Sequence, residues 1–224
     1  MIDIKKQYIP LTRRAQRPQL VICPQYITIH STGNPTSTAQ NEADYVCYNS
    51  NRYASFHFVV DDSEIIQVMP CKELAYHSGT TRGNKYSISI EICKSGDRLK
   101  AINNTIALTL RLMKEYNIPI SRVLRHYDWN NKNCPRILID ENYIKKGINW
   151  DKFLEMLKGE RERMNTEKIY NSLEELEGDF KRAIEWALDN KILYGTGKGL
   201  GLNETTVKCL VFLWRYHKNK EGIK

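Results

Sequence analysis

Three side chains far apart in the sequence have the chemistry needed to hold a metal ion. They are two histidines and one cysteine, His30, His126 and Cys134. Two imidazoles and one thiolate form a borderline-soft donor set that suits Zn²⁺ and leaves the fourth ligand position for water, as in catalytic zinc sites. A closed structural site needs four protein ligands, and no second Cys or His lies close to Cys134 to complete one. The spacing of seven residues between His126 and Cys134 is not specific by itself.

Short strands are predicted to bring these side chains together. Residues 26–30 alternate with β-branched side chains and precede a loop with glycine, asparagine and proline, so His30 is expected at a strand end. Residues 56–68 predict a strand, a turn and a second strand that form a hairpin. Residues 86–92 alternate strictly, which places Glu91 on the face opposite three isoleucines.

Helical periodicity occurs between and after these strands. Residues 38–48, 102–116 and 150–157 have the spacing of apolar side chains that is typical of amphipathic helices. Strands that alternate with helices indicate an α/β domain, a mixed central β-sheet flanked by helices, and we place it at residues 1–158.

A smaller domain is predicted after a charged linker. Residues 159–166 begin with a run of glutamates and arginines that lacks apolar side chains, so we place the linker there. Ser172 and Glu175 form a capping box before an apolar helical face, and a last helix follows a glycine-rich loop. We therefore predict a small, mainly helical C-terminal domain over residues 167–224.

The composition is that of a soluble globular protein with a basic surface. Of 224 residues, 41% are hydrophobic and 27% are charged, and no apolar run approaches the ~20 residues of a membrane span. We expect no membrane insertion, and residues 1–17 contain no secretory signal, which predicts synthesis in the cytosol. The net charge of +8 indicates an anionic partner or only a well-solvated surface. No helix-turn-helix, zinc-finger or aromatic RNA-binding pattern accompanies the charge, so we expect no nucleic-acid partner.

Four segments in a fixed order resemble one enzyme family. Residues 126–136, with the sequence HYDWNNKNCPR, resemble the C-terminal zinc-ligand loop of type 2 N-acetylmuramoyl-L-alanine amidases. Residues 29–32 resemble the first-ligand strand of that family, and residues 54–62 and 87–93 resemble two further motifs. The family also includes phage endolysins and animal peptidoglycan recognition proteins. The resemblance covers about residues 20 to 158.

The resemblance implies a zinc-dependent mechanism. It implies that His30, His126 and Cys134 bind Zn²⁺. It also implies that Glu91 is the general acid/base and that Lys132 stabilises the oxyanion. The chemistry agrees, because zinc lowers the pKa of its bound water toward ~7 and a nearby carboxylate can take that water's proton. A cation close to the third ligand can neutralise the charge that grows on the tetrahedral intermediate.

Two further histidines fall within or beside these motifs. His77 resembles a family position that lines the substrate groove, whereas His57 is expected either to orient a neighbour or to touch substrate. Many members have a tyrosine immediately before the residue that matches His57, but this chain has Phe56, which has no hydroxyl group. Because this hydroxyl group is absent, the acid–base role is expected of Glu91.

The C-terminal domain resembles a module that binds cell walls. Residues 183–197 resemble part of an S-layer-homology repeat, and such repeats bind wall polymers. These repeats usually occur in threes and only one is present here, and a unit of about 60 residues buries little core. We therefore predict either wall binding or homo-oligomer formation, including association with free C-terminal copies made from an internal start at Met164.

These features together favour one function and leave three alternatives. The leading hypothesis is a lytic amidase of the phage endolysin type, made in the host cytoplasm, that cuts the bond between N-acetylmuramic acid and L-alanine after release to the wall. Its partners would be peptidoglycan and secondary wall polymers, which are polyanions that suit the basic body. The alternatives are a host autolysin of the same activity, a non-catalytic peptidoglycan receptor and, last, a nucleic-acid-binding protein. Cys134 argues against the receptor, because receptors of this family have lost a zinc ligand.

Overall fold

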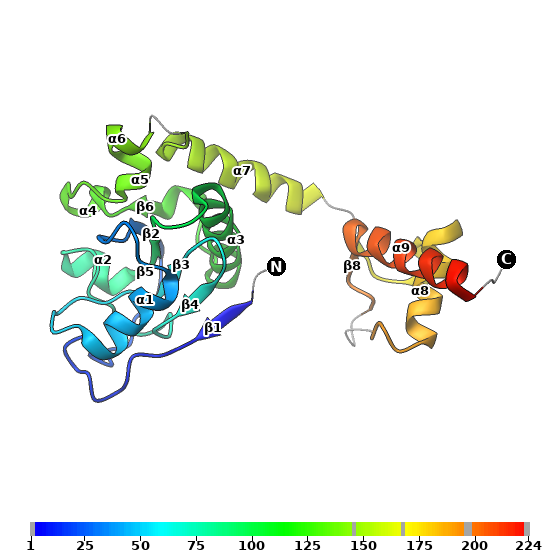
Figure 1. Ribbon diagram of the computed structural model, residues 1–224, viewed down its shortest axis with the longest axis horizontal. Helices are drawn as coiled ribbons and strands as arrows, with labels where there is room; N and C mark the ends of the chain where they lie inside the picture. The colour runs from blue at the N-terminus through cyan, green and yellow to red at the C-terminus, as the bar shows by residue number, and fades with distance from the viewer. Residues whose placement is uncertain (1–2, 145–146, 167–168, 195–198, 222–224) are drawn as a thin grey trace. The chain divides into compact units, whose positions relative to one another are not determined.

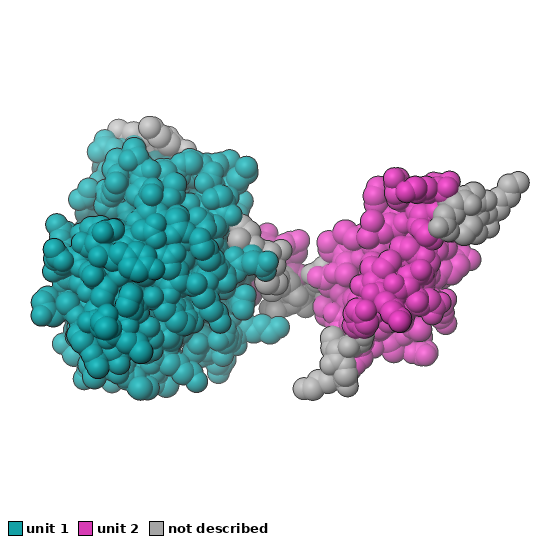
Figure 2. All heavy atoms as spheres, turned by 60° about the horizontal axis from the view of Figure 1, so that its bottom comes forward, with its two compact units in different colours: residues 1–159 teal, residues 160–224 magenta. Residues whose placement is uncertain are grey.

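The computed structural model describes residues 3–144, 147–166, 169–194 and 199–221. The chain divides into two compact units, Met1–Gly159 and Glu160–Lys224, coloured separately in Figure 2. The division lies one residue after the predicted end of the first domain. None of the described helices is long and apolar enough to span a bilayer.

A mixed sheet of six strands forms the centre of the first unit, in the order β1-β4-β3-β5-β2-β6. All neighbouring strands are parallel except β3 and β4, which form the predicted antiparallel hairpin. The predicted α/β class with a mixed central sheet is therefore confirmed. The strands are β1 Ile4–Lys6, β2 Tyr26–Ser31, β3 Phe58–Val60, β4 Ile65–Gln67, β5 Ser87–Ile92 and β6 Val123–Arg125.

Helices cover both faces of this sheet (Figure 1). Side chains alternate between the two faces of a strand, so Ile88, Ile90 and Ile92 all join the core beneath α3 (Arg98–Tyr116) and α7 (Trp150–Thr166). Side chains on the opposite face of the sheet join a second core, which lies beneath α1 (Ala39–Asp44). Helix α1 continues as the π-helical turn η1 (Tyr45–Asn49). The side chain of Asp97 caps the N-terminus of the long helix α3, a position at which aspartate is favoured.

Short elements lie before and after strands β5 and β6. They are α2 Thr81–Tyr86, η2 Ile120–Arg122, α4 Tyr127–Asn130, α5 Arg136–Ile139 and α6 Glu141–Ile144. The guanidinium group of Arg98 donates hydrogen bonds to the carbonyl oxygens of Ile137, Tyr143 and Ile148. These bonds fasten the segment after β6 to the first turn of α3, so the short helices have a fixed support.

The second unit is mainly helical, as predicted. Its core contains Leu176, Ile184 and Leu210 among other apolar side chains. Its elements are β7 Ile169–Tyr170, η3 Leu173–Glu175, α8 Gly178–Asp189, β8 Leu202–Asn203 and α9 Glu204–Glu221, with β7 and β8 antiparallel. Residues 195–197, the end of the segment that resembles an S-layer-homology repeat, lie outside the described residues.

The region after residue 158 contains one local difference from the prediction, in the segment that follows the linker. The predicted linker, residues 159–166, is helical and continues α7, because helix formers such as glutamate and arginine dominate it. The capping box of Ser172 and Glu175 precedes only the 3₁₀ turn η3. Backbone at residues 176–177 is extended, and α8 begins after it at Gly178, whose φ of 53° favours glycine.

Candidate metal centre

Strand register brings the candidate residues to one end of the sheet. In the parallel pair of β2 and β5, His30 is the partner of Glu91. In the parallel pair of β2 and β6, Ile29 is the partner of Arg125, so His126 directly follows the end of β6. The backbone N–H of His126 donates to the carbonyl oxygen of Ile29 at 3.2 Å. The carboxyl ends of parallel strands are the usual place for a site in an open α/β sheet.

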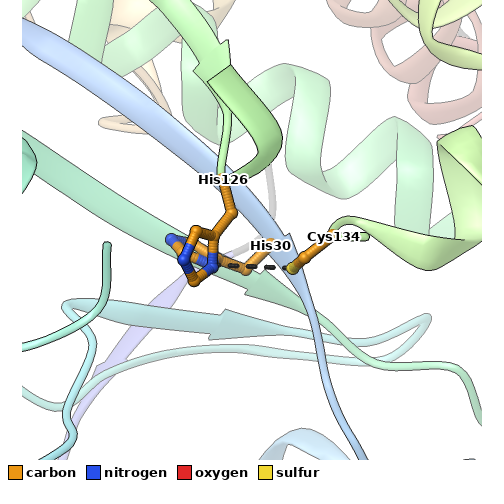
Figure 3. A group of neighbouring side chains, drawn as sticks. All are labelled: His30, His126 and Cys134. Carbon is orange, nitrogen blue, oxygen red and sulfur yellow. Dashed lines mark hydrogen bonds between the residues drawn. The ribbon is translucent and has the colours of Figure 1, made fainter. Parts of the chain in front are cut away.

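Three buried side chains converge there and could hold one metal ion (Figure 3). The Nδ1 atoms of His30 and His126 lie 3.0 Å apart, and the Sγ atom of Cys134 lies 3.8 Å from Nδ1 of His30. Their donor atoms all lie within 4.8 Å of one another. A tetrahedral zinc ion separates two nitrogen ligands by roughly 3.3 Å and nitrogen from sulfur by roughly 3.6 Å. The spacing and the donor set therefore fit Zn²⁺.

Hydrogen bonds hold the loop between His126 and Cys134 in place. The N–H of Tyr127 donates to the carbonyl oxygen of Cys134 at 2.9 Å, which closes the loop. The indole N–H of Trp129 donates to the Thr28 hydroxyl on β2 at 2.9 Å. The Asn130 amide donates to the carbonyl oxygen of Ser78 at 3.0 Å. The peptide bond between Cys134 and Pro135 is cis.

Burial favours the neutral form of each imidazole. It is the main cause that holds the pKa of His30 well below its ordinary value and lowers the pKa of His126 to about 4, with Lys132 adding to both shifts. Neutral imidazole is the form that binds metal. Burial also raises the pKa of the Cys134 thiol to about 12, and the nearby Glu91 adds to this. Metal binding must therefore displace the thiol proton.

Glu91 faces the same centre from the neighbouring strand. Its Oε1 atom lies 3.9 Å from Nδ1 of His30, and its side chain is 19% exposed. Burial, followed by repulsion from Glu42, raises the pKa of Glu91 to about 8, while Lys132 and Lys94 oppose the shift. A cation held by the three donors would lower this pKa again, because it stabilises the carboxylate.

An open cavity of about 370 Å³ lies over this centre. Lys132 and Glu91 both line it, together with His77 and the ring of Phe56. Glu42, which comes from α1, also lines the cavity. The sequence does not predict Glu42 as a site residue, because a glutamate on an amphipathic helix has no feature that distinguishes it from solvated surface. The cavity therefore exposes the candidate residues to a bound molecule.

His77 lines the cavity and also contacts His30. Its Nδ1 atom lies 3.1 Å from Nε2 of His30, the ring nitrogen that faces away from the other two donors. The Asn84 side-chain oxygen on α2 accepts hydrogen bonds from the N–H groups of His77 and Ser78 at 3.0 and 2.9 Å. Asn84 therefore holds the His77 backbone, and His77 can fix the ring orientation of His30.

His57 lies in the core and does not border the cavity. It is fully buried, and its Nδ1 accepts a hydrogen bond from the N–H of Ser89 at 3.0 Å. Its Nε2 therefore carries the proton and donates to the carbonyl oxygen of Glu73 at 2.9 Å. Direct contact with substrate, one of the two roles predicted for His57, does not agree with this burial. The other predicted role, in which His57 orients a neighbouring group, agrees with this burial.

Replacing His77 by alanine is expected to weaken zinc binding by about 10- to 100-fold, because His30 loses the partner that orients its ring. His77→Gln, which keeps an acceptor, should restore part of the affinity. Competition with a chromogenic chelator measures the dissociation constant without reference to any activity. His217→Ala removes a histidine from the second unit and serves as the matched control. Equal affinity of His77→Ala and the unaltered protein would contradict the role given to His77.

The sequence of this chain is similar to those of several known proteins. The sequence matches the family described as N-acetylmuramoyl-L-alanine amidase over residues 19–137. It is 42% identical over 161 residues to the N-acetylmuramoyl-L-alanine amidase CwlH of Bacillus subtilis (strain 168), an alignment that covers 69% of this chain and 60% of CwlH. It is 38% identical over 159 residues to XlyA of the same organism, covering 68% of this chain and 50% of XlyA. The chain thus spans between half and three-fifths of the length of these relatives.

Solved structures resemble the first unit. The catalytic domain of XlyA superposes with a TM-score of 0.63 at 37% identity, covering 70% of this chain and 99% of that domain. The structure of PlyL superposes with a TM-score of 0.61 at 35% identity, covering 70% of this chain and 97% of that structure.

Proposed function

The chain belongs to the N-acetylmuramoyl-L-alanine amidase family, and from this premise we propose that it hydrolyses the amide bond between N-acetylmuramic acid and L-alanine in peptidoglycan. One observation carries the proposal. The His30, His126 and Cys134 donor atoms converge at a cavity that is also lined by Glu91 and Lys132. A metal donor set, a carboxylate and a cation around one space are the groups that metal-assisted amide hydrolysis uses.

We propose that His30, His126 and Cys134 hold Zn²⁺, in agreement with their donor types and spacing. When bound, the ion supplies Lewis acidity for the amide carbonyl and lowers the pKa of water at the site. Glu91 accepts a proton from the attacking water on its carboxylate and delivers it to the nitrogen of the leaving alanine. The Oε1 atom of Glu91 lies 3.9 Å from Nδ1 of His30, so the carboxylate is close to the place where that water would be held.

Lys132 is proposed to stabilise the negative charge that develops on the carbonyl oxygen. It lines the cavity, and its charge lowers the pKa values of His30, His126 and Glu91. Its ammonium group can therefore act on charge that grows at the same place.

Replacing Lys132 by alanine is expected to lower kcat by about 10²- to 10³-fold, because one preorganised positive charge is lost from the transition state. KM should change far less, since the charge arises only during the reaction. Lys94→Ala is the matched control, because Lys94 lies near Glu91 but its ammonium group donates to the carbonyl oxygen of Gly33 at 2.9 Å. A loss confined to KM in Lys132→Ala would place this lysine in substrate binding.

The reaction is tested on purified cell walls. We expect new N-terminal L-alanine to appear without new reducing sugar ends, because the proposed cut frees an alanine amino group and leaves the glycan strand intact. Removal of zinc by a chelator should stop the release, and added Zn²⁺ should restore it. Wall binding without alanine release would instead identify a non-catalytic peptidoglycan receptor.

The protein is further proposed to act as an endolysin on the cell wall, with an autolysin of the same activity as the alternative. Activity on walls presented from outside, compared with growth defects on expression inside a cell, separates the two settings. The second unit is proposed either to bind secondary wall polymers, as the resemblance of residues 183–197 suggests, or to join copies of the chain. Free copies of this unit from an internal start at Met164 would join the same assembly.

A further inference from the structure

A turn near the N-terminus binds the backbone of one wall of the cavity. Gln16, which is 2% exposed, donates from its side-chain amide to the carbonyl oxygens of Ser50 and Arg52 at 3.0 and 2.7 Å. The guanidinium group of Arg13 donates to the carbonyl oxygens of Tyr48 and Ser50. Two side chains of one turn therefore hold the backbone that follows η1.

The backbone held in this way borders the cavity over the metal donors. Five residues of the segment line this cavity, and we call them the 50–56 wall: Ser50, Arg52, Ala54, Ser55 and Phe56. The backbone N–H of Arg52 also donates to the Ser50 hydroxyl at 3.3 Å. Loss of the Gln16 hydrogen bonds is therefore expected to change the shape of the cavity.

The turn that carries Gln16 has its own anchor. Arg17 is 7% exposed, and its guanidinium group donates to both carboxylate oxygens of Glu73 at 2.7 Å. It also donates to the carbonyl oxygen of Ile9 at 2.8 Å. A bidentate pair of this kind fixes geometry as well as adding energy. Gln16 therefore has a fixed support outside the 50–56 wall, in a turn that precedes residue 19, where the match to the family begins.

The charge of the cavity favours an anionic substrate. Among the described residues that line it, Arg52, Lys132 and Arg136 are basic, whereas Glu42 and Glu91 are acidic. A bound Zn²⁺ would add to this excess of positive charge. A guanidinium group can bind a carboxylate through two parallel hydrogen bonds, and the Arg52 side chain is exposed. A carboxylate of the substrate therefore suits the 50–56 wall.

Arg52 differs from the other two basic residues in its distance along the chain from the metal donors. Lys132 and Arg136 flank the donor Cys134, whereas Arg52 belongs to a segment that supplies no metal donor. Arg52 is therefore suited to hold a part of the substrate other than the bond that is cut.

We propose that Arg52 binds the carboxylate of the second residue of the stem peptide, and that Gln16 is the positioning residue that holds Arg52 for this contact. The inference rests on the amidase function proposed above. The second residue directly follows the alanine at the scissile bond, so its carboxylate lies near the metal centre. Amidation of this carboxyl group removes the charge that Arg52 binds. Arg52 therefore makes the enzyme selective for stem peptides in which the group is free.

Two soluble muramoyl pentapeptides, which differ only in whether the carboxyl group of the second residue is free or amidated, test the contact. With the zinc-loaded full chain, we expect KM to be about tenfold lower for the free form, because a charge-assisted hydrogen bond is made only there. Values of kcat should be similar, since the contact is present before and during the reaction. Arg52→Ala should raise KM for the free form and remove the difference, and Arg52→Lys should keep part of it.

Arg14→Ala is the matched control for the charge that is lost. Arg14 is exposed on the same turn as Gln16 but does not line the cavity, so its replacement should leave both KM values unchanged.

Gln16→Ala tests the positioning role. It should raise KM for the free peptide by about tenfold, with kcat and zinc content unchanged, because misplacement of a binding group costs affinity. In an Arg52→Ala background the same change should add little, since residues that act through one contact are not additive. Gln19→Ala is the matched control, because the Gln19 amide donates to the carbonyl oxygen of Leu11 at 2.8 Å and neither residue lines the cavity.

The outcomes separate this inference from the function on which it rests. Equal KM values for the two peptides in the unaltered protein would overturn the carboxylate contact. A Gln16→Ala effect that adds in full to that of Arg52→Ala, or that raises KM for both peptides alike, would reduce Gln16 to a merely structural residue. Absence of alanine release from both peptides and from cell walls would overturn the amidase function itself, and this inference with it.

Discussion

Replacing Cys134 by alanine is expected to weaken zinc binding by more than about 10³-fold and to abolish alanine release from cell walls. A site with three protein ligands that loses its thiolate keeps only two imidazoles, which hold zinc weakly at neutral pH. The buried position of Cys134, 6% exposed, leaves little room for another protein donor to replace it. Metal content after dialysis and the rate of alanine release are measured on the same samples.

Cys47→Ala is the matched control for this change. Cys47 is also fully buried, but its thiol donates to the carbonyl oxygen of Gln7, and Cys47 does not line the cavity over the converging donors. Its replacement removes a similar volume from a core and should leave the zinc content unchanged. A Cys134→Ala variant that retains stoichiometric zinc and full activity would remove this cysteine from the metal site and require a different ligand set.

The strands that carry the site could be predicted because their sequences repeat with a clear period. Residues 26–30 and 86–92 alternate with β-branched side chains, and both form central strands. The edge strands β1 and β6 have only three residues each, too few for a period to appear. Their pairing depends on contacts with distant parts of the chain, which no local pattern contains.

The candidate ligands could be predicted by residue type, whereas the groups that hold them could not. His30 and Cys134 are rare residue types in recognisable segments. The indole N–H of Trp129 donates to the hydroxyl of Thr28, which is distant in the sequence, and the side-chain oxygen of Asn84 accepts from the backbone N–H groups of His77 and Ser78. Asparagine and tryptophan occur in many surroundings, so their positions in the sequence do not predict these hydrogen bonds. Supporting groups of this kind become visible only when the register of the strands is known.

Strand register also explains why one carboxylate is placed beside the metal donors. His30 and Glu91 are direct partners in the parallel pair of β2 and β5, so both side chains leave the same face of the sheet. That face is opposite to the one whose isoleucines pack against α3. A shift of one residue in this register would bury Glu91 among those isoleucines. The pairing of β2 with β5 therefore places the Glu91 carboxylate beside the His30 ring.

Replacing Glu91 by glutamine is expected to lower kcat by about 10²- to 10⁴-fold, while zinc remains bound. Glutamine has nearly the same shape as glutamate, but it cannot accept a proton from water and return it to the leaving nitrogen. The metal donors are unchanged, so the zinc content should stay close to that of the unaltered protein. This separation of rate from metal content distinguishes the role of Glu91 from that of Cys134.

Glu64→Gln provides the matched control for the Glu91 variant. Glu64 precedes β4 and lies 3.9 Å from the Lys5 ammonium group, and it does not border the cavity, so its replacement should leave kcat unchanged. Single-turnover alanine release and zinc content are measured for both variants. A Glu91→Gln rate within about tenfold of the unaltered enzyme would mean that another group handles the proton, because general acid–base catalysis contributes at least ~10²-fold. Glu42 would then be the next carboxylate to replace, because it lines the same cavity and its charge already acts on Glu91.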